Sequence, residues 1–179
     1  MTKLVVLDRD GVVNHESKAF IKNPAEWRAI DGSLDAIARL TAAGFTITIA
    51  TNQSGVGRGL LSDSDLASIH EKMLAEVAAT GGVIDKIVYC PHLPNAGCDC
   101  RKPLPGMLRM LGKYFRVSMA GVPVIGDSGR DLAAARAAGA RPILVLTGNG
   151  EETLADALQA GETVESYTDL AAAADALVS

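Results

Sequence analysis

Two aspartates separated by one residue are the first side chains in this sequence that could do chemistry. Asp8 and Asp10 flank Arg9, and Gly11 follows them directly. Two carboxylates this close repel each other unless a cation neutralises them, and Mg²⁺ is the usual cation in proteins. An Asp-Gly turn at a strand end is the common structural alternative. An EF-hand loop is excluded, because its glycine is the sixth residue of the loop, whereas Gly11 is the fourth counted from Asp8.

Polar side chains with catalytic potential also follow later apolar segments. Thr51 follows one such segment, and Asp127 and Asp131 follow another. Lys102 stands in a loop rich in Pro, Gly and Cys. Each of them alone could be a cap, a turn or a surface residue. Four such groups at one edge of a sheet are difficult to explain as coincidence.

Such a set suits phosphoryl transfer through a covalent aspartyl phosphate. One carboxylate attacks phosphorus, while Mg²⁺ and Lys102 offset the charge of the phosphate and stabilise its equatorial oxygens. Thr51 donates a hydrogen bond to one of those oxygens. Asp10 protonates the leaving alcohol and then deprotonates the water that releases phosphate. Asp127 holds the metal, and Asp131 orients the groups around it.

A second cluster combines every cysteine of the chain with one of its three histidines. Its members lie within eleven residues: Cys90, His92, Cys98 and Cys100. Three thiolates and one imidazole make a closed, tetrahedral Zn²⁺ site of the structural kind. The spacing differs from that of common zinc fingers, so reactive thiols and a disulfide are the alternatives. Because Arg101 and Lys102 follow the last cysteine directly, a structural zinc would rigidify the loop that delivers them.

The pattern along the chain predicts the elements that must bring these groups together. Apolar segments predict strands at residues 4–7, 45–50, 84–89, 122–125 and 143–146, with a short possible strand at 163–165. Helical spacing and caps predict helices at residues 33–43, 62–80, 105–115, 132–138, 151–160 and 169–177. The alternation predicts an α/β fold, a doubly wound Rossmann-like parallel sheet of at least five strands with helices on both faces. In such a sheet the first and fourth strands are neighbours, which brings Asp8, Asp10 and Asp127 to one crevice.

The composition and charge of the chain narrow the class of protein further. Its 179 residues are 48% hydrophobic and 21% charged, which fits one globular domain spanning residues 1–179. A net charge of −4 without a basic run argues against nucleic-acid partners, and no apolar run reaches the ~20 residues of a membrane span. An odd number of cysteines and no signal peptide predict a reducing, cytoplasmic location. No apolar edge or heptad pattern demands a second subunit, so a monomer is expected.

Four segments resemble the four motifs of the haloacid dehalogenase superfamily, in the same order and across nearly the whole chain. They are Asp8-Arg9-Asp10-Gly11, Thr51-Asn52-Gln53-Ser54-Gly55, Arg101-Lys102-Pro103 and Gly126-Asp127-Ser128 with Asp131. The resemblance implies that Asp8 is the nucleophile and Asp10 the acid/base. It implies that Thr51 and Lys102 stabilise the phosphoryl group. It also implies a Mg²⁺ held by Asp8, by the backbone carbonyl of Asp10 and by Asp127.

The motifs are most similar to those of the heptose bisphosphate phosphatases, with the histidinol-phosphate phosphatases as the alternative. The connections where this superfamily inserts cap domains are short here, so residues 16–21, residues 53–59 and the zinc-binding loop should cover the site. The expected substrate contacts are Glu16, Lys18, Asn52, Gln53, Ser54, Arg58, Arg101 and Ser128. The basic side chains among them favour a second phosphate, and hence removal of the 7-phosphate of a heptose 1,7-bisphosphate, a step toward lipopolysaccharide precursors. Glu16 could instead favour the cationic histidinol phosphate.

Two hypotheses from other classes compete with a sugar phosphatase. A receiver-type signalling domain has a similar acidic pair, but its phosphorylated aspartate follows the third strand, where this chain has Cys90. An interaction module held together by zinc would leave the acids at the sheet edge unexplained.

The sequence also supports one expectation each for Ser128 and His70. Ser128 stands where the resembled heptose enzymes carry a lysine, and His70 is expected to be partly exposed in mid-helix, without a partner.

Overall fold

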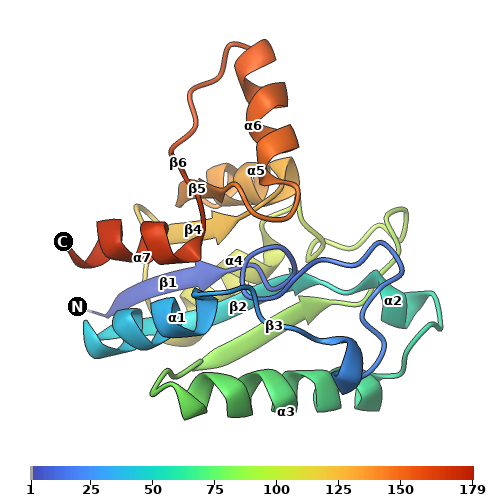
Figure 1. Ribbon diagram of the computed structural model, residues 1–179. Coiled ribbons are helices and arrows are strands. Elements are labelled where there is room, and N and C mark those ends of the chain that lie inside the picture. The colour runs from blue at the N-terminus through green and yellow to red at the C-terminus, as the bar shows by residue number, and fades with distance from the viewer. Residues whose placement is uncertain (1) are drawn as a thin grey trace.

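A parallel sheet of six strands forms the centre of the molecule (Figure 1). The structure is a computed structural model and describes residues 2–179. The strands are β1 (Lys3–Leu7), β2 (Phe45–Asn52), β3 (Lys86–Cys90), β4 (Pro123–Gly126), β5 (Arg141–Val145) and β6 (Ser166–Tyr167). Their order in the sheet is β3-β2-β1-β4-β5-β6, which confirms the predicted adjacency of the first and fourth strands and places β2 on the other side of β1.

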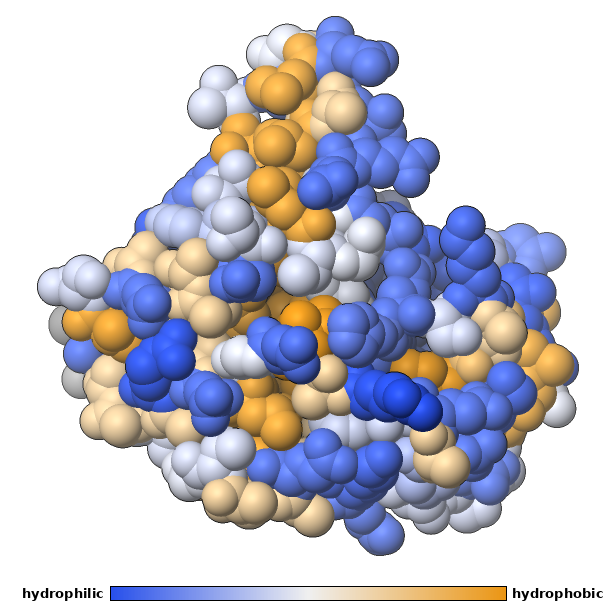
Figure 2. Space-filling view, viewed as in Figure 1, coloured by the Kyte–Doolittle hydropathy of each residue, from blue (hydrophilic) through white to orange (hydrophobic). Residues whose placement is uncertain are grey.

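Helices cover both faces of this sheet, which confirms the doubly wound fold (Figure 1). They are α1 (Ser33–Ala42), α2 (Ser54–Gly57), α3 (Asp63–Ala79), α4 (Gly106–Phe115), α5 (Gly129–Ala137), α6 (Gly150–Gln159) and α7 (Leu170–Val178), with a 3-10 helix η1 (Pro24–Glu26). Side chains of α1, α3 and α7 pack into one core, and those of α4 and α5 pack into a second core. Helix α6 projects away from the sheet, and Figure 2 shows apolar side chains along it. Among residues 2–179, no helix is both long and apolar enough to span a membrane.

Strand β1 explains why four apolar residues stand together in the sequence. Val5 and Leu7 belong to the core beneath α1, α3 and α7, whereas Leu4 and Val6 belong to the core beneath α4 and α5. A strand with neighbours on both sides and helices on both faces needs apolar side chains on both faces. Asp8 follows directly, so it is the first polar side chain that the centre of the sheet presents at its carboxyl end.

The connection between β1 and α1, residues 8–32, folds against the rest of the molecule instead of forming a cap domain. Trp27 is completely buried in the core that includes α3. Lys72 Nζ, on α3, donates hydrogen bonds of 2.9 Å to the backbone oxygens of Pro24 and Trp27. This attachment fixes the connection, whose residues 16–21 reach a pocket beside Asp10.

Several element boundaries differ from the prediction, and those of β6, α5 and β3 are the ones discussed next. Strand β6 is Ser166–Tyr167 rather than residues 163–165, because residues 166 and 167 are the ones that align with β5. Helix α5 begins three residues earlier than predicted, at Gly129, because Asp131 accepts hydrogen bonds from the backbone and hydroxyl of Ser128 and so caps the helix start. Strand β3 begins at residue 86 rather than 84. The apolar pattern does not predict α2 and η1, which are too short to show a helical period.

Candidate active site

Three carboxylates meet at the carboxyl ends of the central strands, and we call them the acidic cluster. Asp8 follows β1 and Asp127 follows β4, while Asp131 lies in the first turn of α5. One oxygen of each lies within 4.8 Å of an oxygen of the other two. Because β1 and β4 are hydrogen-bonded neighbours, the sheet itself brings these distant parts of the sequence together. The acidic cluster therefore lies in the crevice where the strand order predicts a ligand.

Lys102 is the buried counter-charge of the acidic cluster. Its side chain is almost completely buried, and its Nζ lies 3.0 Å from Asp8 Oδ1 and also contacts Asp131. Another hydrogen bond, of 2.8 Å, goes to the backbone oxygen of Ala50 in β2. Burial disfavours the charge, but the two carboxylates outweigh burial and raise the pKa of Lys102 above its ordinary value. The side chain is therefore a fixed ammonium beside the predicted nucleophile.

Asn52, a predicted substrate contact, uses both polar atoms of its amide within the protein. Its Nδ2 donates to the backbone oxygen of Lys102 at 3.0 Å, and the Lys102 N–H donates back to its Oδ1 at 3.1 Å. The peptide bond from Lys102 to Pro103 is cis. These two hydrogen bonds attach the loop after β3 to the end of β2, so Asn52 determines where the lysine stands.

Burial raises the pKa of two carboxyls in the acidic cluster. For Asp8, burial is the largest cause of the rise in pKa. Lys102 acts in the opposite direction, whereas repulsion from the other acids raises the pKa further, to about 7. For Asp127, burial and repulsion from neighbouring acids outweigh hydrogen bonds from Asn149, and the pKa rises to about 6. A divalent cation between these oxygens would remove the repulsion and restore the ionised form. The cluster thus fits a hard cation such as Mg²⁺, which prefers carboxylate oxygens.

Asp127 occupies a space that exists because two neighbours lack side chains. A Cβ at Gly11 would lie 2.1 Å from Asp127 Oδ2, and one at Gly148 would lie 2.2 Å from the same atom. The Asn149 N–H and Nδ2 donate to Oδ2 at 2.8 and 3.1 Å. Nδ2 also donates to Glu16 at 2.6 Å, which links the loop over the site to this carboxylate. Sequence reasoning misses Asn149, and its position at the start of α6, just after a strand, is the available signal.

The predicted acid/base, Asp10, is held by donors from three residues. Arg9 Nε and Nη2 donate to its Oδ1 at 3.2 and 2.9 Å, and Nη2 also reaches Oδ2 at 3.1 Å. Asn14 Nδ2 donates to Oδ1 and Gln53 Nε2 donates to Oδ2, each at 2.8 Å. Gln53 Nε2 also donates to Thr51 Oγ1 at 2.9 Å, so one amide connects two predicted catalytic side chains. Nothing in the spacing of Arg9 and Asn14 marks them for this task, and sequence reasoning misses both.

His70 is buried and has a partner, so the prediction for this residue is wrong. Its Nε2 lies 3.3 Å from Arg9 Nη1. Burial, and then repulsion from Arg9, lower the pKa of His70 to about 4. The physical reason lies in the helical period: His70 shares one face of α3 with Leu66 and Met73, which are both in the core.

A pocket of about 340 Å³ opens beside Asp10. Most of the predicted substrate contacts line it: Glu16, Lys18, Asn52, Gln53, Ser54, Arg58 and Arg101. Ser128 does not line this pocket; its hydroxyl donates to Asp131 Oδ2 at 2.6 Å. Arg130, at the start of α5, also lines the pocket, although nothing in the sequence around it predicts this position.

Cationic side chains surround this opening. They are Lys18, Arg58, Arg101 and Arg130. Such a concentration of positive charge attracts an anionic substrate. A larger hollow, of about 650 Å³, lies near the amino ends of the strands and is lined by residues such as Lys3, Phe45 and Arg116. None of the predicted catalytic side chains lines that hollow, so the smaller pocket is the candidate substrate site.

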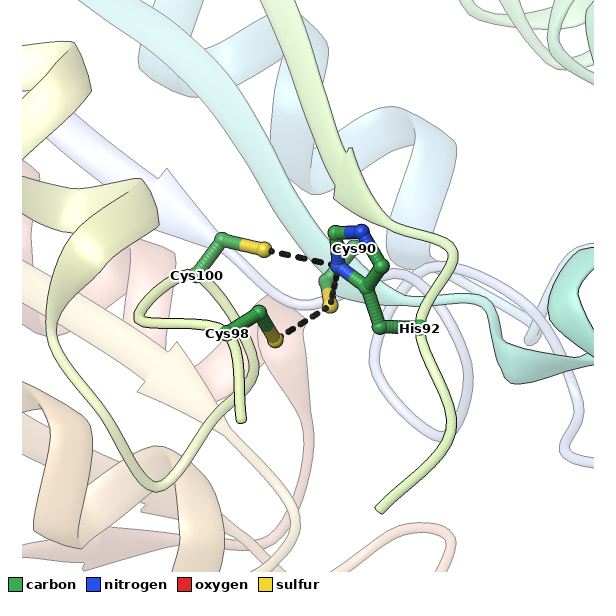
Figure 3. Close-up of side chains that lie close together, drawn as sticks. All are labelled: Cys90, His92, Cys98 and Cys100. Carbon is green, nitrogen blue, oxygen red and sulfur yellow. Dashed lines mark hydrogen bonds between the residues drawn. The ribbon is translucent and has the colours of Figure 1, made fainter. Parts of the chain in front are cut away.

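The four side chains predicted to hold zinc point toward one another, and we call them the thiol cluster (Figure 3). Their ligand atoms all lie within 4.8 Å of one another. Cys90 Sγ lies 3.7 Å from Cys98 Sγ and 3.4 Å from His92 Nδ1, and that nitrogen lies 3.3 Å from Cys100 Sγ. Zn–S bonds of about 2.3 Å in a tetrahedron separate two sulfurs by about 3.8 Å, so the cluster has the dimensions of a zinc site. No disulfide joins these cysteines.

The thiol cluster is also connected to the candidate substrate pocket. The N–H of Gly57, in α2, donates to the backbone oxygen of Pro91 at 3.0 Å. Arg101 Nη1 donates to the backbone oxygen of His92 at 3.3 Å. Both contacts tie the loop that carries the thiol cluster to residues beside the pocket. The position of Arg101 therefore depends on the fold of this loop.

Taken together, these groups can perform phosphoryl transfer. Asp8, the predicted nucleophile, lies beside a fixed ammonium, and Asp10, the predicted acid/base, accepts a hydrogen bond from Gln53. The acidic cluster offers oxygen ligands to a divalent cation, and a cationic pocket adjoins it. This is the combination that such a reaction requires, because catalysis here consists of positioning and charge stabilisation.

Comparison with known proteins gives a consistent result. A family model described as "HAD-hyrolase-like" matches residues 99–173. The D-glycero-beta-D-manno-heptose-1,7-bisphosphate 7-phosphatase of Bordetella bronchiseptica is 55% identical over 178 residues, covering 98% of each chain. The enzyme of that name from Pseudomonas putida is 51% identical, covering 98% of this chain and 99% of its own. The crystal structure of the D,D-heptose 1.7-bisphosphate phosphatase of B. bronchiseptica, complexed with magnesium and phosphate, matches with a TM-score of 0.95 and 54% identity, over 99% of this chain and 98% of that one.

Proposed function

Because the chain belongs to the family of D-glycero-beta-D-manno-heptose-1,7-bisphosphate 7-phosphatases, within the HAD-like hydrolases, we propose that it removes the 7-phosphate of that heptose bisphosphate. It is a phosphoric monoester hydrolase. The observation that carries the proposal is the acidic cluster with its buried ammonium, open to a pocket surrounded by cations. Each site residue has a proposed task that follows from the contacts its side chain makes.

In the first step, Asp8 is the nucleophile. One of its carboxylate oxygens forms a bond to phosphorus, and the bond from phosphorus to the sugar oxygen breaks, leaving its electron pair on that oxygen. Asp10, protonated at this stage, gives its proton to the departing oxygen, so a neutral alcohol leaves. The Lys102 ammonium, 3.0 Å from Asp8 Oδ1, offsets charge on the equatorial oxygens, and Thr51 donates a hydrogen bond to one of them.

In the second step, water hydrolyses the aspartyl phosphate. The water oxygen attacks phosphorus while its proton passes to Asp10, and the bond between phosphorus and the Asp8 oxygen breaks. The electron pair of that bond returns to Asp8, and inorganic phosphate leaves. Arg9, Asn14 and Gln53 all donate hydrogen bonds to Asp10, and these contacts fix the orientation of the carboxylate that accepts the proton.

A divalent cation completes the proposed site. Asp8, Asp127 and the backbone carbonyl of Asp10 would hold it, and the raised pKa of the first two carboxyls is the sign that a cation fits there. We infer Mg²⁺, the ion in the related crystal structure. When bound, it polarises the phosphoryl oxygens and neutralises charge that opposes the attack. Asp131 contacts Lys102 and Ser128, so its proposed task is to hold the ammonium.

The thiol cluster is proposed to hold one structural Zn²⁺. Its four ligand atoms would satisfy a tetrahedral ion completely, which leaves no position for substrate. The ion would hold the loop that delivers Arg101 and Lys102. The three cysteines form no disulfide, which is typical of proteins in a reducing compartment, so we place the enzyme in the cytoplasm. We also propose that it works as a monomer.

The cationic pocket supports a substrate with a second phosphate. Lys18, Arg58, Arg101 and Arg130 line it, and arginine can donate paired hydrogen bonds to a phosphate. Histidinol phosphate carries cationic groups at its far end, which these side chains repel. Glu16 is the acidic member of the lining and would be the contact for that alternative substrate.

The test is a comparison of kcat/KM for the heptose bisphosphate and for histidinol phosphate at one Mg²⁺ concentration. We expect the bisphosphate to be preferred, with loss of the 7-phosphate and retention of the 1-phosphate visible by phosphorus NMR. Arg101→Ala should reduce kcat/KM for the bisphosphate by about tenfold or more, because a charge-assisted pair contributes about 1.5–3 kcal/mol. A higher kcat/KM for histidinol phosphate would overturn the substrate assignment. Absence of Mg²⁺-dependent phosphate release from both would overturn the phosphatase mechanism.

A further inference from the structure

We propose that His70 is a positioning residue for the reaction: its unprotonated Nε2 orients Arg9, and Arg9 in turn orients the acid/base Asp10. His70 lies on α3, away from the substrate pocket, and contacts neither the acidic cluster nor Asp10 directly. The inference rests on the proposed function, because it takes Asp10 as the group that transfers the proton. It adds a residue of α3 to the groups that support this proton transfer.

Arg9 is an unusual arginine because it is 1% exposed. It alternates with Asp8 and Asp10, so its side chain turns toward the face that α3 covers while the acids turn toward the site. From there its Nε and Nη2 return to both oxygens of Asp10 in a forked contact. Such a fork fixes the plane of the carboxylate as well as its position.

The remaining nitrogen of the guanidinium, Nη1, lies 3.3 Å from His70 Nε2. Arginine has donors only, so Nε2 must be the acceptor, and the ring must be neutral with its proton on Nδ1. Burial and the nearby guanidinium lower the pKa of His70 to about 4, in agreement with a neutral ring. Tyr89 of β3 packs with its ring edge-on, 6.2 Å away between ring centres. His70 is thus a fixed acceptor at the inner end of a hydrogen-bonded series that ends on Asp10.

Loss of this acceptor would leave a buried N–H of Arg9 without a partner. A guanidinium in that state turns to find another acceptor, and its fork on Asp10 tilts with it. Asn14 and Gln53 still hold Asp10 from other directions, so the carboxylate stays in place with its plane less well fixed. Proton transfer depends on that orientation, and we therefore expect a partial loss of about tenfold in kcat.

The experiment compares three variants of the full-length, zinc-loaded enzyme at saturating Mg²⁺. His70→Leu removes the acceptor, His70→Gln keeps a neutral acceptor, and Met73→Leu changes a buried neighbour on the same face of α3 that makes no polar contact with Arg9. We expect His70→Leu to lower kcat about tenfold with KM changed less than twofold. His70→Gln should recover most of the kcat, and Met73→Leu should keep it.

A second arm asks whether the effect passes through Asp10. In an Asp10→Asn background, His70→Leu should lower kcat no further, because effects that share one route are not additive. Three outcomes would each refute the positioning role. The first is a wild-type-like kcat in His70→Leu, and the second is an equal loss of kcat in His70→Leu and His70→Gln. The third is a further tenfold loss of kcat when His70→Leu is added to Asp10→Asn. If the wild-type enzyme itself showed no Mg²⁺-dependent turnover, the proposed function would be at fault, so the two failures are distinguishable.

Discussion

The acidic cluster and the thiol cluster are both compact groups of metal-ligating side chains, yet they are assembled in opposite ways. The acidic cluster collects residues from β1, β4 and α5, so it exists only when the sheet is complete. The thiol cluster comes from eleven consecutive positions, from Cys90 at the end of β3 to Cys100 in the loop that follows. The first is built by the fold, whereas the second is built by local chain geometry.

The two clusters also differ in what balances their charge. In the acidic cluster, the ammonium of Lys102 contacts Asp8 and Asp131, so part of the repulsion is removed before any metal arrives. In the thiol cluster, the hydrogen bonds of the four side chains run largely among themselves, and no lysine or arginine side chain is bonded to a sulfur among residues 2–179. We infer that the acidic cluster depends on the fold more than on its metal, and that the thiol cluster depends on its metal more than on the fold.

The substitution expected to have the largest effect is Asp8→Asn, which should disable the acidic cluster and leave the thiol cluster intact. The variant keeps the size of the side chain but removes the nucleophile, so kcat should fall by at least about 10³-fold. The thiol cluster should be unaffected, with zinc still near one equivalent by elemental analysis. Asp35→Asn, an exposed acid on α1, is the matched control and should keep full activity. Turnover above a few per cent of wild type in Asp8→Asn would remove Asp8 from its role.

The complementary substitution, which disrupts the thiol cluster, is Cys98→Ser. The loop should lose its zinc, and kcat/KM should fall by about 10–100-fold, because Arg101 and Lys102 then stand in the wrong place. Asn95→Ser, an exposed change in the same loop, should keep both zinc and activity. Elemental analysis and steady-state kinetics on the same preparations provide the measurement. Full activity in a zinc-free Cys98→Ser enzyme would show that the loop does not need the ion.

The contrast between the clusters also explains what the sequence can predict. The thiol cluster can be predicted from the sequence because its members are close in the chain and include every cysteine. The strands β1 and β4 are readable because buried parallel strands consist of apolar runs, and their adjacency follows from the doubly wound topology. These two facts are enough to predict that Asp8 and Asp127 lie together, as they do in the acidic cluster, of which Asp10 is not a member.

The residues that hold the catalytic side chains in place are harder to predict from the sequence. Arg9 and Asn149 act through hydrogen bonds whose partners are chosen only when loops have folded, and no spacing rule encodes them. His70 illustrates the same limit: its helical spacing with Leu66 and Met73 indicates the buried face, but its partner Arg9 lies 61 positions away in the sequence, and no spacing rule joins the two. Strand β6 is misplaced in the sequence prediction because two residues carry no detectable alternation.

A smaller effect concerns the candidate substrate pocket, whose lining includes one arginine from the side of each cluster. Arg130 comes from α5, on the side of the acidic cluster, whereas Arg101 comes from the loop of the thiol cluster. We expect Arg130→Ala to lower kcat/KM for the bisphosphate about tenfold, mainly through KM, and to change hydrolysis of a sugar monophosphate less than twofold. Arg136→Ala, on the same helix and paired with Glu162, is the control. Equal losses on both substrates would mean that Arg130 does not hold the distal phosphate.

The smallest effect is a pH dependence of the stabilisation by Mg²⁺. The pKa of Asp8 is raised to about 7 in the metal-free fold, against 3.8 for an unperturbed aspartate. Between these values the folded protein keeps a proton that the unfolded chain has lost, so metal-free stability falls as pH rises from about 4 to 7. Mg²⁺ removes this penalty by taking the place of the proton. The gain in Tm from Mg²⁺ should therefore be larger at pH 8 than at pH 5.5, by about 3–6 °C for each tenfold change in affinity.

Thermal unfolding with and without Mg²⁺ at the two pH values measures this effect. Asp8→Asn has no proton to exchange at that position, so its gain in Tm should be smaller and should vary less with pH. An equal gain at both pH values in the wild-type protein would contradict the link between the raised pKa and the cation.

The single ammonium in the acidic cluster has a consequence for the timing of catalysis. Three carboxyl groups face one lysine, so the single ammonium cannot offset the negative charge of the crevice once Asp8 and Asp127 lose their protons. A phosphate ester that arrives first meets electrostatic repulsion, whereas one that arrives after the cation meets a balanced site. The two ligands should therefore bind in a compulsory order, cation before ester. Inorganic phosphate should accordingly leave before the cation, which stays behind for the next turnover.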